Sequence, residues 1–188
     1  MTPRTEGRHL DAGERAARSR AMKTLIIVTG HAGAGKTTRG RELATSTGWP
    51  LLDKDTLFGP IADDLVGPAD RDSPSYLERV RPFEYTGLFD AAIEILRYGT
   101  PGVIVVAPCG RELTSPDGAW LGRIVARAAN VGARTQVEWL DVDDAERRRR
   151  LEARGAARDA DKLEHWAEWA ASLRDPLDSP FIVRRSTD

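Results

Sequence analysis

The sequence predicts an α/β protein in which helices cover both faces of a parallel β-sheet. Short, continuous apolar runs rich in β-branched residues recur along the chain, and longer segments with helical patterns lie between them. Strands that are buried on both faces show such unbroken apolar runs, and strands that alternate with helices form parallel sheets. A glycine-rich loop directly after the first apolar run supports the same class.

In chain order, we expect strands at residues 23–29, 49–53, 102–107, 134–142 and 180–185, of which the second and fifth have the weaker patterns. Between them we expect helices at residues 36–46, 83–98, 117–131, 143–154 and 160–173. Residues 57–76 contain three prolines and four aspartates, so we expect an irregular segment there. Long irregular segments inside a compact domain often form lids or binding loops.

The composition limits the class of protein. The 188 residues suit one domain, and 28 basic against 29 acidic residues give a formal charge of -1. No overall charge therefore attracts the chain to nucleic acid or to an anionic membrane, and any such partner would have to use a local patch. Cys109 is the single cysteine, and no apolar run approaches the ~20 residues that span a bilayer. Residues 1–21 lack an apolar signal region and a periodic apolar face, so we expect a disordered extension, a domain over residues 22–188 and a cytoplasmic location.

The loop after the first strand has the spacing of a phosphate-binding loop. Gly30, four further residues, then Gly35, Lys36 and Thr37 stand between a strand and a helix. In this arrangement the backbone N–H groups converge on phosphate oxygens, the lysine reaches the β- and γ-phosphates, and the threonine hydroxyl binds Mg²⁺. The predicted nucleotide-binding residues are Gly30, His31, Ala32, Gly33, Ala34, Gly35, Lys36, Thr37 and Thr38.

Two aspartates follow the second strand, at the sheet edge where α/β proteins bind ligands. In "LLDKDTL", Asp53 and Asp55 stand two residues apart. One carboxylate would hold a magnesium ion while the other accepts the proton of an acceptor hydroxyl. The alternative is structural: a turn in which Asp55 caps the following helix.

With these residues the chain resembles the P-loop kinases of small metabolites, such as shikimate kinase, gluconate kinase and chloramphenicol phosphotransferase, and is similar to the zeta-toxin and polynucleotide kinase relatives. The resemblance covers residues 23–185. It implies a three-layer fold with the strand order 2-3-1-4-5, a helical lid, and ATP and Mg²⁺ as cofactors. It also implies that Asp53 binds Mg²⁺ and that Asp55 orients the acceptor. The third strand ends in "VVAPCGREL", without the acid that many P-loop enzymes carry there.

A basic segment near the end, "DAERRRRLEARGAARDADKLEHW", contains Arg150, Arg154 and Arg158 at intervals of four residues. This spacing would place them on one helical face, although Gly155 interrupts the pattern. The resemblance implies a lid whose arginines neutralise the transferring phosphoryl group. We expect residues 147–149 to form a solvated face instead.

The phosphoryl acceptor is less well defined. Arg79 and Arg81 precede Pro82, which favours an extended or turn-like step, and we expect both to face the acceptor. The function predicted is transfer of a phosphoryl group to a small-molecule hydroxyl, and the acidic segment 57–76 favours an amine-bearing acceptor such as an aminosugar or antibiotic. Arginines 79, 81 and 111 keep a 5′-polynucleotide kinase open; a toxin-type nucleotide-sugar kinase and a non-catalytic nucleotide switch are further alternatives. The oligomeric state is not predicted.

Overall fold

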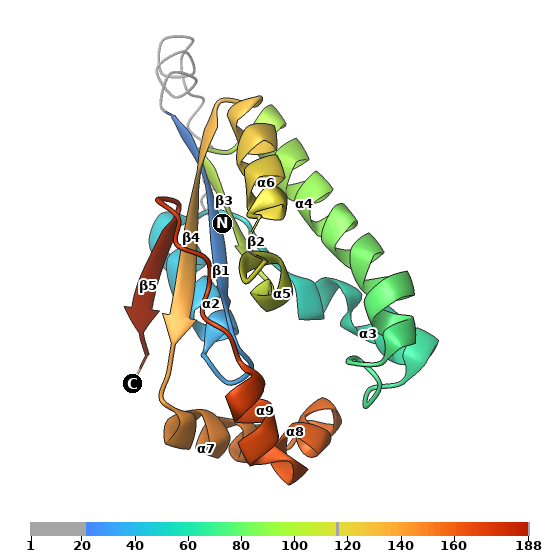
Figure 1. Cartoon of the computed structure of the whole chain (residues 1–188). Coiled ribbons are helices and arrows are strands. Elements are labelled where there is room, and N and C mark those ends of the chain that lie inside the picture. Colours follow the sequence, from blue (N-terminus) through green and yellow to red (C-terminus); the bar gives the residue numbers. More distant parts are fainter. Residues whose placement is uncertain (1–21, 116, 188) are drawn as a thin grey trace, which may run out of the picture.

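A computed structural model describes residues 22–115 and 117–187, and the extension predicted over residues 1–21 lies outside them. Five parallel strands form one sheet in the order β2-β3-β1-β4-β5, which confirms the predicted order (Figure 1). Their bounds are β1 Lys23–Gly30, β2 Leu51–Asp53, β3 Gly102–Val106, β4 Ala133–Asp141 and β5 Ile182–Ser186.

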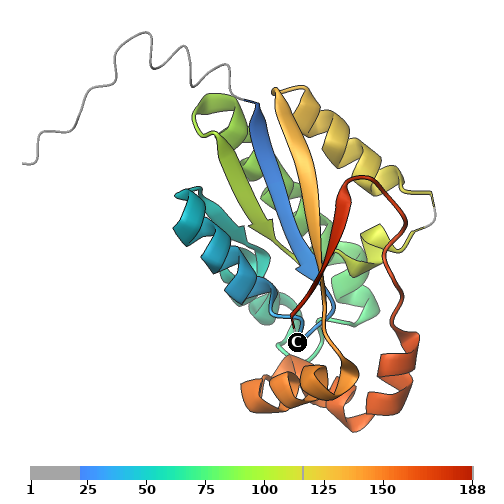
Figure 2. The ribbon, with the colours of Figure 1, turned by 90° about the vertical axis from the view of Figure 1, so that its left-hand side faces the viewer.

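Helices cover both faces of the sheet, and the alternation of side chains along β1 shows why (Figure 2). Ile26 and Val28 face helix α2, Lys36–Thr47, in one apolar cluster. Leu25 and Ile27 belong to a larger cluster with helices α4, Arg81–Tyr98, and α6, Ala119–Ala129. Because successive side chains of a strand point to opposite faces, an unbroken apolar run serves both layers.

The segment after β2 differs from the prediction. Residues 57–66, predicted to be irregular, belong to helix α3, Lys54–Val66, and the irregular part shrinks to residues 67–73. The helix begins because the Asp53 carboxylate accepts the backbone N–H groups of Asp55 and Thr56, at 2.9 and 3.2 Å. Pro60 has no backbone N–H and leaves one intrahelical hydrogen bond unmade. The helix tolerates this loss because the burial of Ala62 adds tertiary packing.

A π-helical segment, η1 Tyr76–Val80, leads directly into α4. An extended or turn-like step was predicted before Pro82, but Arg81 has helical angles, φ −52° and ψ −42°, and the helix continues through it. Pro82 stands in the first turn of α4, a position that proline commonly occupies in helices.

The remaining helices lie beyond the carboxyl ends of the strands. Helix α5, Gly110–Leu113, follows β3. The lid, defined as residues 144–172, contains α7 Asp144–Arg154, η2 Ala157–Asp159, α8 Ala160–Glu164 and α9 Trp166–Ser172, at the bottom of Figure 1. The helix predicted at 160–173 is divided at His165. Helix α7 ends at Gly155, φ 59°, so Arg158 does not continue its face as predicted. No helix in the described part of the chain has the length and hydropathy needed to cross a membrane.

Candidate active site

A cleft of about 840 Å³ lies between the sheet edge and the lid. Its size falls in the usual range of small-molecule sites, which is about 300–1,000 Å³. The predicted residues that line it are Gly30, His31, Ala32, Gly33, Gly35, Lys36, Thr37, Thr38, Asp55, Arg81, Arg150, Arg154 and Arg158. Ala34 packs into the core instead, and Asp53 lies behind Thr37. The structure thus brings most of the predicted residues to one cleft.

The glycine-rich loop needs its glycines. Gly30 has φ 141°, and a Cβ there would stand 2.6 Å from the Leu140 carbonyl oxygen. Gly33 has φ 81°, and a Cβ would stand 2.9 Å from Cγ of Arg147. Gly35, also with positive φ, occupies the N-cap of α2 and brings no side chain that could cap the helix. The first N–H groups of α2 therefore face the cleft, where an anion can accept them.

Lys36 extends across this loop. Its Nζ donates a hydrogen bond to the His31 carbonyl oxygen at 2.8 Å. Burial lowers the pKa of Lys36 to about 8; Asp55 opposes this shift, and the neighbouring Arg154 and Arg158 add to it. The buried ammonium group has lost hydrating water, which disfavours its charged form. Phosphate oxygens bound next to it would compensate for this loss.

Thr37 and Asp53 form the oxygen pair in which a magnesium ion would fit. The Thr37 hydroxyl donates to Oδ2 of Asp53 at 2.9 Å, while Oδ1 caps α3. Asp53, rather than Asp55, is therefore the helix cap, and the structural alternative for Asp55 is wrong. The described residues contain no group of three or more His, Cys, Asp or Glu side chains that could hold a metal alone. Mg²⁺ typically binds one or two protein oxygens together with waters and substrate phosphates, and the oxygens of Thr37 and Asp53 suit this type of coordination.

Asp55 faces the cleft among three cations. Its Oδ2 accepts a hydrogen bond from Nη1 of Arg158 at 2.7 Å, and its Oδ1 lies 3.3 Å from Nζ of Lys54 and 3.7 Å from Nη1 of Arg71. Burial of the Asp55 carboxyl favours the neutral form, but these cations outweigh it and lower the pKa. The group is a carboxylate at neutral pH and can accept a hydroxyl hydrogen bond.

A buried network beside Asp55 was missed by the sequence analysis. Nζ of Lys54 donates to the Tyr76 hydroxyl and to Oε2 of Glu84, both at 3.0 Å, and the Tyr76 hydroxyl donates to the same Oε2 at 2.7 Å. These contacts connect α3, η1 and α4 and fix the backbone that carries Asp55. The only signal in the sequence was a lysine enclosed by two aspartates, since Tyr76 and Glu84 are distant along the chain.

The lid arginines reach the cleft by different routes. Nη1 of Arg150 lies 3.4 Å from the Gly33 carbonyl oxygen, its Nε donates to Glu146 at 2.6 Å, and its Nη2 donates to the Thr187 carbonyl oxygen at 2.5 Å. Nε of Arg154 donates to the buried Asp159 at 2.8 Å. The chain thus supplies guanidinium groups on the lid side of the phosphate loop.

Two arginines lie elsewhere than predicted. Arg147 was expected on a solvated face but is buried, and its Nη2 donates to the Val142 carbonyl oxygen at 2.8 Å. Arg79 is exposed and does not line the cleft, so the structure does not bring it to the predicted acceptor site.

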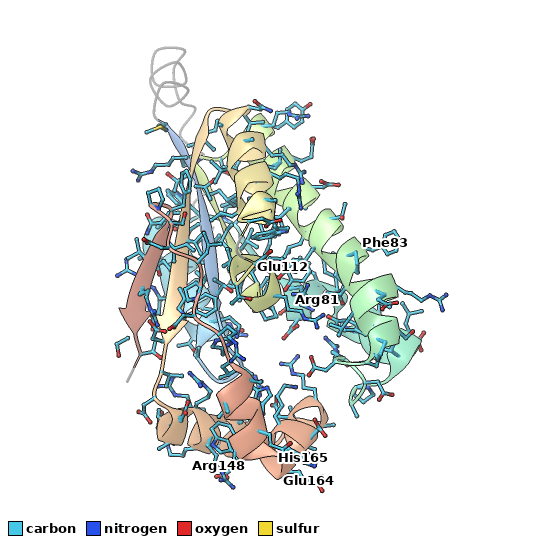
Figure 3. The ribbon with its side chains drawn as sticks, in the orientation of Figure 1. Arg81, Phe83, Glu112, Arg148, Glu164 and His165 are labelled. Carbon is cyan, nitrogen blue, oxygen red and sulfur yellow. The ribbon has the colours of Figure 1, made fainter. Side chains whose placement is uncertain are left out.

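Arg81 lines the cleft, but its guanidinium is already engaged. It forms a two-pronged ion pair with Glu112, and its Nη2 also donates to the Tyr85 hydroxyl at 3.0 Å and the Pro108 carbonyl oxygen at 3.2 Å. Figure 3 shows Arg81 and Glu112 facing each other between α4 and α5. Arg81 therefore holds α5 in place beside the cleft.

The chain belongs to the AAA domain family AAA_33, whose model matches residues 25–176. Among solved structures, it is similar to a candidate kinase from Chloroflexus aurantiacus J-10-fl, with 25% identity, a TM-score of 0.64, and coverage of 89% of this chain and 87% of that chain. A gluconokinase from Sinorhizobium meliloti 1021 is 19% identical, with a TM-score of 0.52 and coverage of 89% and 84%. A comparison with curated proteins finds no match.

The APS kinase CysC of Mycobacterium tuberculosis, in complex with AMPPNP and APS, is 17% identical, with a TM-score of 0.51 and coverage of 89% of this chain and 90% of that one. The fold is therefore that of the small-molecule P-loop kinases.

Proposed function

We propose that the protein is an ATP- and Mg²⁺-dependent kinase that transfers the γ-phosphoryl group to a hydroxyl of a small molecule. The observation that carries the proposal is that a carboxylate, Asp55, lies in the same cleft as Lys36 and Thr37, whose hydroxyl is hydrogen-bonded to Asp53 behind it. A phosphate loop alone would bind a nucleotide. A carboxylate held in the same cleft adds a place for a hydroxyl acceptor.

The residues of the cleft divide the work of the reaction. The N–H groups of the loop and Lys36 would hold the β- and γ-phosphates, and Thr37 and Asp53 would hold Mg²⁺, which supplies charge neutralisation to the phosphates. Asp55 would accept the hydrogen bond of the acceptor hydroxyl and direct its oxygen at the γ-phosphorus. As the new O–P bond forms, the bond from the γ-phosphorus to the β,γ-bridging oxygen breaks, ADP leaves with the electron pair, and the hydroxyl proton passes to Asp55.

The lowered pKa of Asp55 bears on the timing of this proton transfer. A weakly basic carboxylate accepts the proton late, when the new O–P bond has acidified the hydroxyl, which suits a loose transfer with little bond formation in the transition state. Arg158 would release Asp55 to the acceptor and turn to the phosphoryl group. A well-placed arginine of this kind contributes ~10³ or more in rate.

The test is acceptor-dependent formation of ADP. The purified protein would be given ATP, Mg²⁺ and a panel of sugars, sugar acids, aminosugars, nucleosides and 5′-hydroxyl oligonucleotides. Lys36→Ala should lower the rate by ~10² or more while the protein stays folded. Arg41→Ala is the matched control, because Arg41 is exposed on the same helix and does not line the cleft. A folded Lys36→Ala variant with native turnover would refute the proposal, and nucleotide binding without any acceptor-dependent turnover would favour a nucleotide switch.

A further inference from the structure

The charge of the cleft indicates what kind of acceptor it suits. Ten lysine and arginine residues line it, against three aspartates. The acidic side chains of segment 57–76 do not change this balance, because Asp63, Asp64 and Asp70 are exposed and do not line the cleft. Asp72 does line it, but accepts a hydrogen bond from Lys162 at 2.6 Å. The premise for an amine-bearing acceptor is therefore not met.

Most of the cleft cations already have a carboxylate partner. Seven of the ten lie within ion-pair distance of one: Lys54, Arg71, Arg81, Arg150, Arg154, Arg158 and Lys162. Lys36 belongs to the phosphate loop. Within residues 22–115 and 117–187, Arg111 and Arg174 are the two remaining cleft cations, and neither has a carboxylate within 4.0 Å. Their charge is available to a ligand.

These two arginines come from segments that are joined. Arg111 belongs to α5, and Arg174 follows α9. The backbone N–H of Leu177 donates to the Leu113 carbonyl oxygen at 2.7 Å, which attaches the segment after α9 to α5. His31 of the phosphate loop lies between them: its Nε2 is 3.1 Å from the Arg174 carbonyl oxygen, and its Nδ1 lies 3.9 Å from where a Cβ on Gly110 would be.

The guanidinium groups of Arg111 and Arg174 have nitrogens that can bind a ligand. Nη1 of Arg174 donates to the carbonyl oxygens of Ala171 and Leu173, at 2.9 and 3.0 Å, which orients the group and leaves Nη2 and Nε. Arg111 is carried by α5, which the ion pair between Arg81 and Glu112 fixes from the other side (Figure 3). Arginine presents its donors in a planar fork that matches the oxygens of a carboxylate or a phosphate.

We propose that the acceptor carries a negatively charged group, a carboxylate or a phosphate ester, which binds Arg111 and Arg174 while its hydroxyl meets Asp55. The inference rests on the proposed function and adds the chemical class of the acceptor. Binding an anion at these two arginines also connects the segment directly after the lid to α5, so acceptor binding and lid position are coupled through the segment that contains Arg174.

The test measures binding to protein saturated with AMPPNP and Mg²⁺, so that the nucleotide half of the cleft is filled. Isothermal titration would compare four probes: D-gluconate, D-glucose 6-phosphate, D-glucose and D-glucosamine. At least one anionic probe should bind ~10-fold or more tightly than the neutral sugar and the amine, because a charge-assisted pair is desolvated in the cleft. The order of gluconate and glucose 6-phosphate distinguishes a carboxylate from a phosphate.

Variants assign the effect to the two arginines. Arg111→Gln and Arg174→Gln should each weaken binding of the preferred anion ~10-fold, and Arg111→Lys should lose only part of it, because the charge remains without the fork. Arg123→Gln, an exposed arginine on α6 away from the cleft, should bind like the native protein. AMPPNP affinity should be the same in all four variants.

Several results would overturn the inference. Equal affinity for gluconate, glucose 6-phosphate and glucose would do so, as would the absence of binding by both anions. Anion binding that is unchanged in Arg111→Gln and Arg174→Gln would also overturn it, and weakened AMPPNP binding would assign these arginines to the nucleotide instead. If AMPPNP itself does not bind the native protein, the proposed function fails, and this inference fails with it.

Discussion

Asp53 offers the sharpest test of the site, because its two oxygens serve different purposes. Oδ1 accepts the backbone N–H groups of Asp55 and Thr56 and starts α3, while Oδ2 accepts the Thr37 hydroxyl. In Asp53→Asn, the amide oxygen can keep the cap, but an NH₂ group then faces Thr37. An NH₂ group cannot bind a cation, so this substitution should separate folding from magnesium binding.

The expected magnitudes follow from these contacts. Asparagine caps about as well as aspartate, so Asp53→Asn should change the free energy of unfolding by less than about 0.5 kcal/mol. Asp53→Ala loses the cap and should cost about 1–2 kcal/mol, which lowers Tm by about 2–8 °C in a domain of this size. Both variants should raise the Mg²⁺ concentration for half-maximal turnover by ~10-fold or more.

The assay combines thermal unfolding with turnover measured across a magnesium titration. Asp143 provides the matched control, since its side chain caps α7 by accepting the Glu146 N–H at 2.9 Å and does not line the cleft. Asp143→Asn and Asp143→Ala should repeat the stability pattern without moving the magnesium midpoint. If Asp53→Asn turns over with a native magnesium midpoint, Asp53 is a helix cap only and the metal assignment is wrong.

Three further predictions concern other parts of the molecule. Phosphates bind the protonated form of Lys36, whose pKa is about 8, so AMPPNP affinity should fall as pH rises through 8, by up to about tenfold per pH unit. A fluorescence titration in which the affinity is unchanged up to pH 9 would contradict this prediction. The affinity of Lys36→Arg should not change with pH over this range, because the arginine keeps its charge. Asp55→Asn should lower kcat by ~10² or more with little change in AMPPNP affinity, and near-native kcat would remove its acceptor role. Gly102→Ala should destabilise the protein by about 1–3 kcal/mol, because the new Cβ would stand 2.3 Å from the Trp49 ring, whereas Gly122→Ala, with open space at mid-helix, should stabilise it by about 0.5–1 kcal/mol; urea unfolding of both variants checks the contrast.

The strands and the phosphate loop were predictable because local signals determine them. The order of apolar run, glycines, Lys36 and helix is specific, and the five predicted strands all occur within two residues of their expected bounds. Helix α3 was not predictable in the same way. Pro60 and the neighbouring glycines are typical of a loop, whereas the cap from Asp53 and the burial of Ala62 depend on how the segment packs.

The site shows the same division between local and distant information. The sequence predicted that the phosphate loop and the "DKD" segment contribute to the cleft. It did not predict the ion-pair partners of the charged residues there, because most of these partners are distant along the chain. Sequence spacing gave Arg79 and Arg81 equal standing, yet one is exposed and the other is engaged by Glu112. Which arginines remain available depends on their carboxylate partners in the fold, and no linear pattern contains that information.

The single buried cysteine has a practical consequence. Cys109 is fully inaccessible, and burial raises the pKa of its thiol far above the usual range, so it should resist thiol-specific reagents. Any cysteine introduced on the surface can then be labelled selectively without first removing the native one. Phe83 lies on α4 and Glu164 lies on α8 of the lid, on opposite sides of the cleft, and both side chains point away from it (Figure 3). Spin labels on Phe83→Cys and Glu164→Cys would report the distance between α4 and the lid as nucleotide and acceptor are added.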